Sequence, residues 1–103
     1  MGVLKLGNLE FEWDDAKAAA NLSKHAVSFP EAATAFLDTH AEMVADIDHS
    51  EEEDRFVLLA ISARLRILVV IHAARGLRVR IISARTATAN ERRRYDATRD
   101  GGR

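Results

Sequence analysis

Three apolar segments follow one another in the second half of the chain, each joined to the next by only four residues. The segments cover residues 55–61, 66–72 and 77–83. Joins this short favour antiparallel hairpins, and Gly76 in the second join can supply the positive φ that such turns often need. The sequence therefore predicts an antiparallel meander in this half of the chain.

The first half predicts one strand followed by two short helices. Residues 9–13 alternate apolar and acidic side chains, as a half-buried strand does. Asp14 is suited to cap a helix over residues 15–25. Ser28 and Glu31 have the spacing of a capping box and begin the second helix, which Pro30 separates from the first.

The remaining elements complete an α+β fold. Residues 41–47 predict a weak strand, and the acidic stretch 46–54 that follows predicts a solvated loop. Thr88 and Glu91 repeat the capping-box spacing at the start of a last helix, which ends near Thr98. The predicted order is β-α-α-β-β-β-β-α, with a curved antiparallel sheet and the helices on one face.

Length and cysteine content limit what this fold can do. A chain of 103 residues forms one domain, predicted over residues 1–98 with a flexible tail at 99–103, and excludes a large cofactor-binding fold. The absence of cysteine excludes disulfides, thiolate zinc sites and thiol nucleophiles. We expect no cofactor. The N-terminal segment has no apolar run that suits a signal peptide or a membrane span, so we expect a cytoplasmic protein with no membrane contact.

Charge is divided unequally along the chain. Residues 1–54 hold three lysines and 13 acids, a net charge of −10, whereas residues 55–103 hold 12 arginines and three acids, a net charge of +9. Arginine matches the geometry of phosphate and stays charged at any working pH, so the second half could bind an anionic partner. Alternatively, the two halves neutralise each other across the fold.

Strand periodicity predicts where the arginines point. Ile67, Val69 and Ile71 form a wholly apolar face, which we expect to be the core. In the last strand, Leu77, Val79 and Ile81 alternate with arginines at positions 78 and 80. The second sheet face is therefore mixed and arginine-bearing, and could support a sugar–phosphate backbone.

Several blocks of residues between about 10 and 96 form a characteristic set: Phe11-Glu12-Trp13-Asp14, Lys17, Asn21, Lys24-His25, Val27-Ser28-Phe29, Glu31-Ala32-Ala33, Asp48-His49-Ser50-Glu51, Arg55, Arg80-Ile81-Ile82-Ser83-Ala84-Arg85, Glu91 and Tyr95. In this order the blocks resemble the BrnT family of bacterial type II toxins. One departure is Ala26, where the family pattern leads us to expect glycine and where alanine tolerates a positive φ poorly.

This resemblance implies a RelE-like ribonuclease fold and a toxin that arrests growth and translation by cutting RNA. It also implies neutralisation by a BrnA-like antitoxin with a ribbon-helix-helix DNA-binding part. The toxin would then reach operator DNA only through that antitoxin.

Metal-free RNA cleavage needs a base for the ribose 2′-OH, cations for the pentavalent phosphorane and an acid for the departing 5′-oxygen. The candidate base or phosphate binder is Lys24 or His25, and His72 is a further proton carrier. The remaining candidates are grouped by role: Arg55, Arg80 and Arg85 stabilise the transition state, and Lys17, Asn21, Arg78 and Tyr95 bind substrate.

Several candidates also have structural interpretations. His25 would offset the dipole of the first helix, His72 would be a satisfied structural group, and Tyr95 would belong to the core. A magnesium site in the acidic stretch 46–54 is a metal-dependent alternative. The alternative from a different class is a non-catalytic module that binds nucleic acid or protein through the arginine face.

Overall fold

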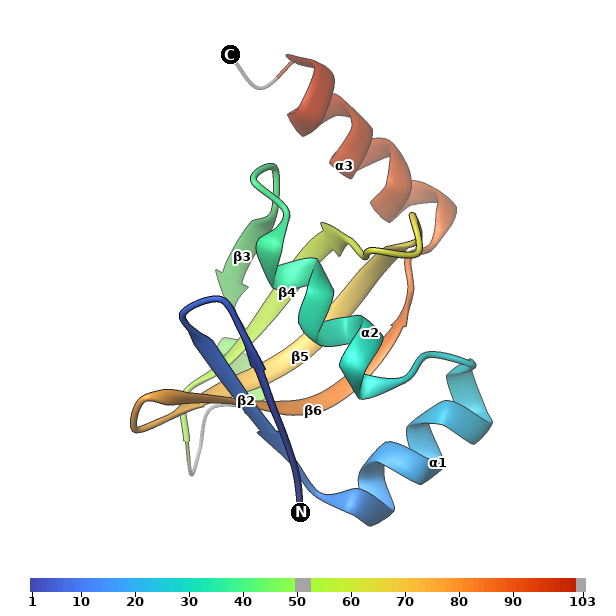
Figure 1. Cartoon of the computed structure of the whole chain (residues 1–103). Coiled ribbons are helices and arrows are strands. Elements are labelled where there is room, and N and C mark those ends of the chain that lie inside the picture. Colours follow the sequence, from blue (N-terminus) through green and yellow to red (C-terminus); the bar gives the residue numbers. More distant parts are fainter. Residues whose placement is uncertain (50–52, 102–103) are drawn as a thin grey trace.

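A computed structural model describes residues 1–49 and 53–101 of the chain, and within them a mixed six-stranded sheet with three α-helices (Figure 1). The elements in chain order are β1 (Gly2–Leu6), β2 (Leu9–Trp13), α1 (Asp15–His25), α2 (Phe29–Thr34), the 3-10 turn η1 (Ala35–Leu37), β3 (Glu42–Ala45), the 3-10 turn η2 (Ile47–His49), β4 (Arg55–Ile61), β5 (Ile67–Arg75), β6 (Arg78–Thr86) and α3 (Ala89–Gly101).

The strand order in the sheet is β1-β2-β6-β5-β4-β3. The predicted α+β class and the β4–β5–β6 meander are confirmed. The sheet differs from the prediction in two respects: β1 forms an additional hairpin with β2, and β2 pairs parallel to β6. Periodicity did not predict β1 because Val3, Leu4 and Leu6 break strict alternation. Periodicity also gives no information about which strand, distant in the sequence, forms hydrogen bonds with β2.

The main core lies between the sheet and the α2–η1 segment, which crosses the sheet in Figure 1. Leu68, Val70 and Ile81 face this core. The Ile67–Val69–Ile71 face, which was predicted to form the core, instead contributes Val69 and Ile67 to a second, smaller core. Because β5 is apolar on both faces, its alternation does not identify the helix-covered face, where the main core lies. Leu77 also differs from the prediction, since it lies in the β5–β6 turn and is 99% exposed.

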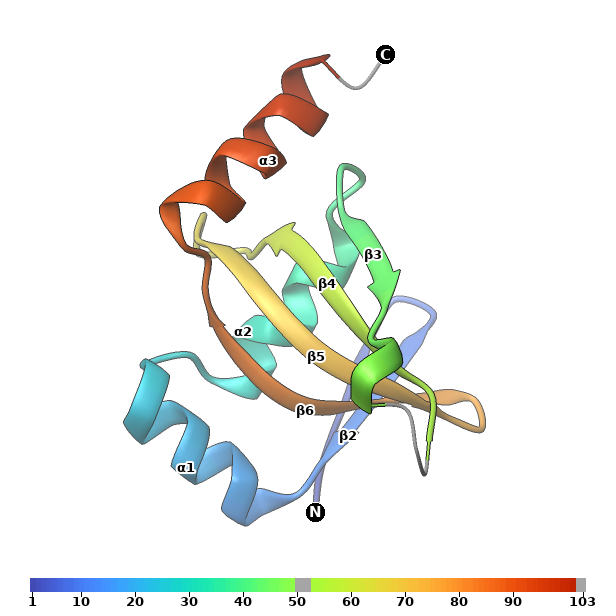
Figure 2. The same ribbon diagram turned by 180° about the vertical axis from the view of Figure 1, so that it is seen from behind.

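A smaller core lies on the opposite sheet face, where α3 extends from one end of the sheet (Figure 2). Tyr95 of α3 packs there with Leu59 and Val69. The last helix runs to Gly101 rather than ending near Thr98, and of the predicted flexible tail, residues 102–103 lie outside the described part. Among the described helices, none combines the length and apolar character needed to cross a bilayer.

Helix α1 has the ends that its sequence predicts. The Asp14 carboxylate accepts a hydrogen bond from the backbone N–H of Lys17 at 2.9 Å, and the helix begins at Asp15. At the other end, Ala26 adopts the left-handed conformation with φ of 56°. Alanine therefore performs the turn for which glycine was expected, at a cost of about 1 kcal/mol.

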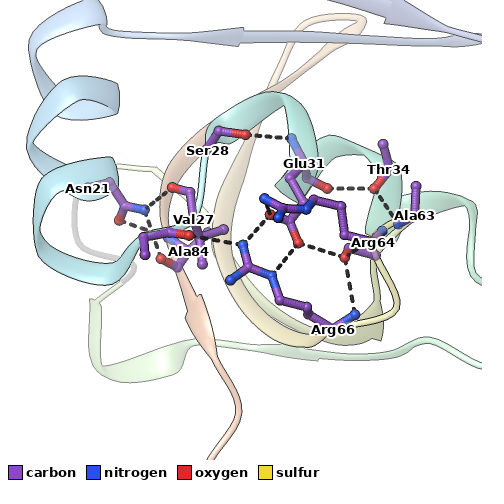
Figure 3. A network of polar contacts seen from close by, with 11 residues as sticks. Asn21, Val27, Ser28, Glu31, Thr34, Ala63, Arg64, Arg66 and Ala84 are labelled. Carbon is purple, nitrogen blue, oxygen red and sulfur yellow. Dashed lines mark hydrogen bonds and ion pairs between the residues drawn. The ribbon is translucent and has the colours of Figure 1, made fainter.

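An ion pair between the buried Glu31 and the half-buried Arg66 joins α2 to the β4–β5 hairpin (Figure 3). The Glu31 carboxylate accepts from Arg66 Nε at 2.9 Å, from Arg66 Nη2, and from the Ser62 hydroxyl at 2.7 Å. Arg66 Nη2 also donates to the carbonyl of Ala26 at 2.9 Å. The hydrogen bonds from Arg66 hold the pKa of Glu31 below its usual value. This cluster ties both helices to one end of the sheet.

We expect Glu31→Gln to lower the free energy of unfolding by about 3 kcal/mol, because it removes the charge of a buried carboxylate and leaves the half-buried Arg66 without its partner. Urea unfolding followed by circular dichroism measures this loss. The matched control is Arg64→Ala: Arg64 lies 3.8 Å from the same carboxylate, but its side chain is 71% exposed. Its loss should stay within about 0.5 kcal/mol. Equal losses in the two variants would contradict this account of the cluster.

Candidate active site

Cationic side chains from three distant parts of the sequence line a small pocket at the junction of β2 and α1 with β4 and β6. The pocket has a volume of about 60 Å³, and we call it the arginine pocket. It is lined by Asp14, Lys17, Glu53, Arg55, Arg80, Ile81 and Ile82.

Strand pairing positions the two arginines of the pocket. Arg55 of β4 and Arg80 of β6 both pair with Ala73 of the central strand β5. Directly paired residues of neighbouring strands point to the same face, so the two guanidinium groups flank a small side chain. Helix α1 follows β2 without a linker and brings Lys17 to the same place. The sequence predicted all three residues as site residues, and the structure gathers them.

A bulge in the β5–β6 ladder sets the orientation of the last arginine of β6. The register shifts between Ile71 and His72, so that Arg85 pairs with Val69 while Arg80 pairs with Ala73. Val69 and Ala73 are four positions apart in β5 and face the same side. Arg80 and Arg85 therefore share a face although they are five positions apart, an odd number that would put them on opposite faces of a regular strand. The distance along the strand is about 13 Å, which leaves Arg85 outside the arginine pocket.

Arg85 is bound to the start of α3. Its Nη1 and Nη2 donate to the two carboxylate oxygens of Glu91 at 2.8 and 3.0 Å. Glu91 also accepts from the backbone N–H of Thr88, completing the predicted capping box. The hydrogen bonds from Arg85 lower the pKa of Glu91 to about 2. Arg85 therefore has a structural role, in which it holds the start of α3 against the end of β6.

Acidic residues of the first half pair with arginines of the second half. Arg80 Nε lies 3.3 Å from Glu12, and Arg78 lies 3.4 Å from Glu10 and 3.6 Å from Glu12. Further pairs of this kind are Arg66–Glu31, Arg75–Glu53 and Arg94–Glu42. The two halves therefore neutralise each other over much of the surface. Arg78 is part of this pairing and lies beside the pocket without lining it.

His72 lies on the other face of the sheet. It pairs with Phe56 and is packed against Phe36 with ring centroids 4.7 Å apart, and the residue is 4% exposed. Arg55 and Ala73, the adjacent pair, point to the opposite face. Burial lowers the pKa of His72, so neutral imidazole is favoured. The structure supports the structural interpretation of His72 and separates it from the arginine pocket.

Two of the predicted substrate-binding residues are buried. Both amide hydrogens of Asn21 are used, since its Nδ2 donates to the carbonyls of Val27 at 3.0 Å and Ala84 at 2.8 Å (Figure 3). The Tyr95 hydroxyl donates to Asp38 at 2.6 Å, and burial together with this contact raises the pKa of Tyr95 to about 12. These contacts hold α1 and α3 in place and leave neither group facing the pocket.

Lys24 and His25 lie in the last turn of α1. Lys24 is exposed and His25 is half-buried. Seven residues separate Lys17 from Lys24, so the two lysines lie on nearly the same helix face and about 10 Å apart along the axis. The structure therefore places Lys24 and His25 outside the arginine pocket, at the far end of the helix that supplies Lys17.

Sequence reasoning missed three features of the site. Asp14 was identified only as a helix cap, although the β2–α1 junction places it in the pocket. Glu53 belonged to a stretch interpreted as a solvated loop, but it lines the pocket and lies 3.5 Å from Arg75. Glu12 was named as an alternating strand residue and as part of a family block, with no role assigned to it, although it lies beside Arg80 of the pocket. The sequence feature that could have indicated a role is its place two residues before Asp14, the cap of the first helix.

The described residues hold no group of three or more histidine, aspartate or glutamate side chains arranged to bind a metal. The acidic stretch 46–54, where a magnesium site was the alternative, includes residues 50–52, which lie outside the described part.

The chain matches a family described as the ribonuclease toxin, BrnT, of type II toxin–antitoxin systems, over residues 13–91. Its fold is similar to the 1.1 Å crystal structure of the Brucella abortus ribonuclease toxin, BrnT, with a TM-score of 0.57 and 23% sequence identity. That similarity covers 74% of this chain and 92% of the Brucella chain. No curated protein matches the sequence.

We expect the buried His72 to make stability depend on pH. Burial in the folded protein disfavours the protonated imidazole of His72, whereas the unfolded chain binds this proton freely. The contribution of His72 to the free energy of unfolding should therefore fall as pH drops below about 6.5 and stay level above it. Glu31 and Glu91 have lowered pKa values and should add a loss only below about pH 4.5.

The variant His72→Phe keeps the ring contacts and should remove the pH dependence between about pH 5 and pH 7. Urea unfolding at several pH values measures it, and His40→Phe is a control because His40 is exposed. An unchanged slope in the His72 variant would show that another group is responsible.

Proposed function

The chain belongs to the BrnT family of ribonuclease toxins of type II toxin–antitoxin systems, and from this premise we propose that it cleaves RNA at the arginine pocket without a metal ion. The observation that carries the proposal is the convergence of Lys17, Arg55 and Arg80 on one pocket of about 60 Å³. Cations that line one small pocket suit the binding of a single phosphodiester.

The proposed reaction is an internal transesterification. The ribose 2′-oxygen forms a bond to the adjacent phosphorus, and the bond from phosphorus to the 5′-oxygen of the next nucleotide breaks. A base takes the 2′-OH proton, and the 5′-oxygen gains a proton as it leaves. The products are a 2′,3′-cyclic phosphate and a 5′-OH. This chemistry requires RNA, because DNA lacks the 2′-OH.

Arg55 and Arg80 would hold the non-bridging oxygens of this phosphate. Negative charge on these oxygens grows in the phosphorane, so guanidinium groups fixed by the sheet stabilise the transition state more than the ground state. Both arginines pair with Ala73, so no large side chain of β5 stands between them on this face. Lys17 would add a third cation from α1.

Proton transfer needs a group within reach of the 2′-OH. Glu53 lines the pocket, and its carboxylate is the acceptor that we propose. Lys24 and His25, which the sequence suggested for this role, would instead contact neighbouring nucleotides, since α1 extends its cationic face about 10 Å beyond Lys17.

The membership in a type II toxin family implies an antitoxin partner and an RNA substrate. We propose that the partner is a BrnA-like antitoxin with a ribbon-helix-helix, that contact with operator DNA occurs only through it, and that the toxin blocks translation and growth in the cytoplasm. A small reading frame adjacent to this gene would be its source. A toxin gene with no such neighbour would contradict this part of the proposal.

We expect the purified protein to cleave single-stranded RNA in excess EDTA. Arg80→Ala and Arg55→Ala should each lower the cleavage rate on the order of 100-fold, because each removes a donor to the transition state. Glu53→Gln should lower it as well. Arg93→Ala is the matched control, since it removes one positive charge from the exposed surface of α3 and should cleave like the wild type.

Three results would contradict the proposal. Cleavage lost only on adding EDTA would favour a metal-dependent site. Tight RNA binding with no cleavage, free or on ribosomes, would favour the non-catalytic binding module. Equal rates for Arg80→Ala and Arg93→Ala would place the chemistry outside the arginine pocket.

A further inference from the structure

We propose that Glu12 is a positioning residue that holds the guanidinium of Arg80 in its orientation toward the arginine pocket. This inference rests on the proposed function, since it concerns the same pocket. Glu12 does not line the pocket itself and acts through Arg80.

The parallel pairing of β2 with β6 brings the two residues together. Glu12 pairs directly with Arg80 in the register of these strands. The carboxylate oxygen Oε2 of Glu12 lies 3.3 Å from Arg80 Nε, and Glu12 is 8% exposed. Arg80 Nε is itself buried and has no hydrogen bond of good geometry, and Glu12 is the carboxylate that lies within 4 Å of it among the described residues, whereas Asp14 interacts with Arg80 through space from the lining of the pocket.

The guanidinium group is planar, so a contact at Nε also fixes the orientation of its two terminal nitrogens. With Nε directed to Glu12, the terminal nitrogens remain for the pocket. Arg55 and Lys17 line the same pocket and repel Arg80, and the carboxylates of Asp14 and Glu53 in the lining offset part of this repulsion. Glu12 adds a negative charge directly beside Arg80 and lowers the cost of holding the three cations together.

Glu10 provides a comparison within the same strand. It lies two residues before Glu12 and faces the same side of β2. Its carboxylate lies 3.4 Å from Arg78, and its side chain is 42% exposed. Glu10 and Glu12 therefore have the same charge and similar strand positions, but Glu12 is the one beside Arg80.

The first test is a double-mutant cycle on RNA cleavage under single-turnover conditions. Glu12→Gln keeps the size of the side chain and should lower the rate roughly tenfold, whereas Glu10→Gln should stay within about twofold of the wild type. In an Arg80→Ala background, Glu12→Gln should have no further effect, because its action passes through Arg80. In an Arg78→Ala background, the tenfold loss should persist.

Binding of an uncleavable 2′-deoxy RNA separates positioning from loss of folded protein. Glu12→Gln removes a negative charge near the phosphate, so its affinity for this RNA should equal or exceed that of the wild type while its rate falls. A tenfold loss in both the wild-type and the Arg80→Ala backgrounds would overturn the proposal. A wild-type rate for Glu12→Gln would overturn it as well.

A second readout does not depend on cleavage. The Arg80 Nε–H proton, which is buried beside Glu12, should exchange slowly with water in nuclear magnetic resonance spectra of the wild type and of Glu10→Gln. It should exchange at least tenfold faster in Glu12→Gln. Equal exchange in the three proteins would overturn the positioning role. Slow exchange in a wild-type protein that fails to cleave RNA would support positioning and contradict the proposed function alone.

Discussion

The buried carboxylate of Glu31 fixes the arrangement on which the rest of the structure depends. It binds Arg66 and Ser62 of the β4–β5 hairpin, and Arg66 in turn holds the carbonyl of Ala26 at the end of α1. Asn21 then joins the middle of α1 to β6. Two helices that bury few large side chains of their own are thereby held against the sheet, and the first turn of α1 reaches the arginine pocket.

Local pairing, rather than net charge, determines where this protein can bind an anion. The acidic first half folds over the arginine-rich second half, and ion pairs to Glu10, Glu31 and Glu42, together with Glu91 of the second half itself, occupy arginines that the sequence leaves available. In the arginine pocket, strand pairing and α1 bring three cations together, although Arg80 also pairs with Glu12 and the carboxylates of Asp14 and Glu53 line the same pocket. The charge asymmetry of the sequence thus indicates a basic site, but the fold leaves only a few of the cationic side chains in that site.

Local patterns in the sequence were sufficient to predict most helices and strands and part of the candidate site. Asp14 and Thr88 cap the helices that they predict, and the two hairpins follow from short joins. Long-range pairing was not predictable: the parallel contact of β2 with β6 and the bulge beside His72 decide which face each side chain takes. For this reason the predicted substrate-binding residues included Asn21 and Tyr95. In the structure these two side chains are buried and form hydrogen bonds that hold α1 and α3 in place.

The central claim is that the arginine pocket promotes attack by the ribose 2′-OH of RNA. The most direct measurement compares an RNA strand with an identical strand that carries a single 2′-deoxy nucleotide at the mapped cleavage position, both in EDTA. The account predicts that the RNA yields a 2′,3′-cyclic phosphate and that the substituted strand stays intact at this position. Cleavage of both strands at the same position and rate would contradict it.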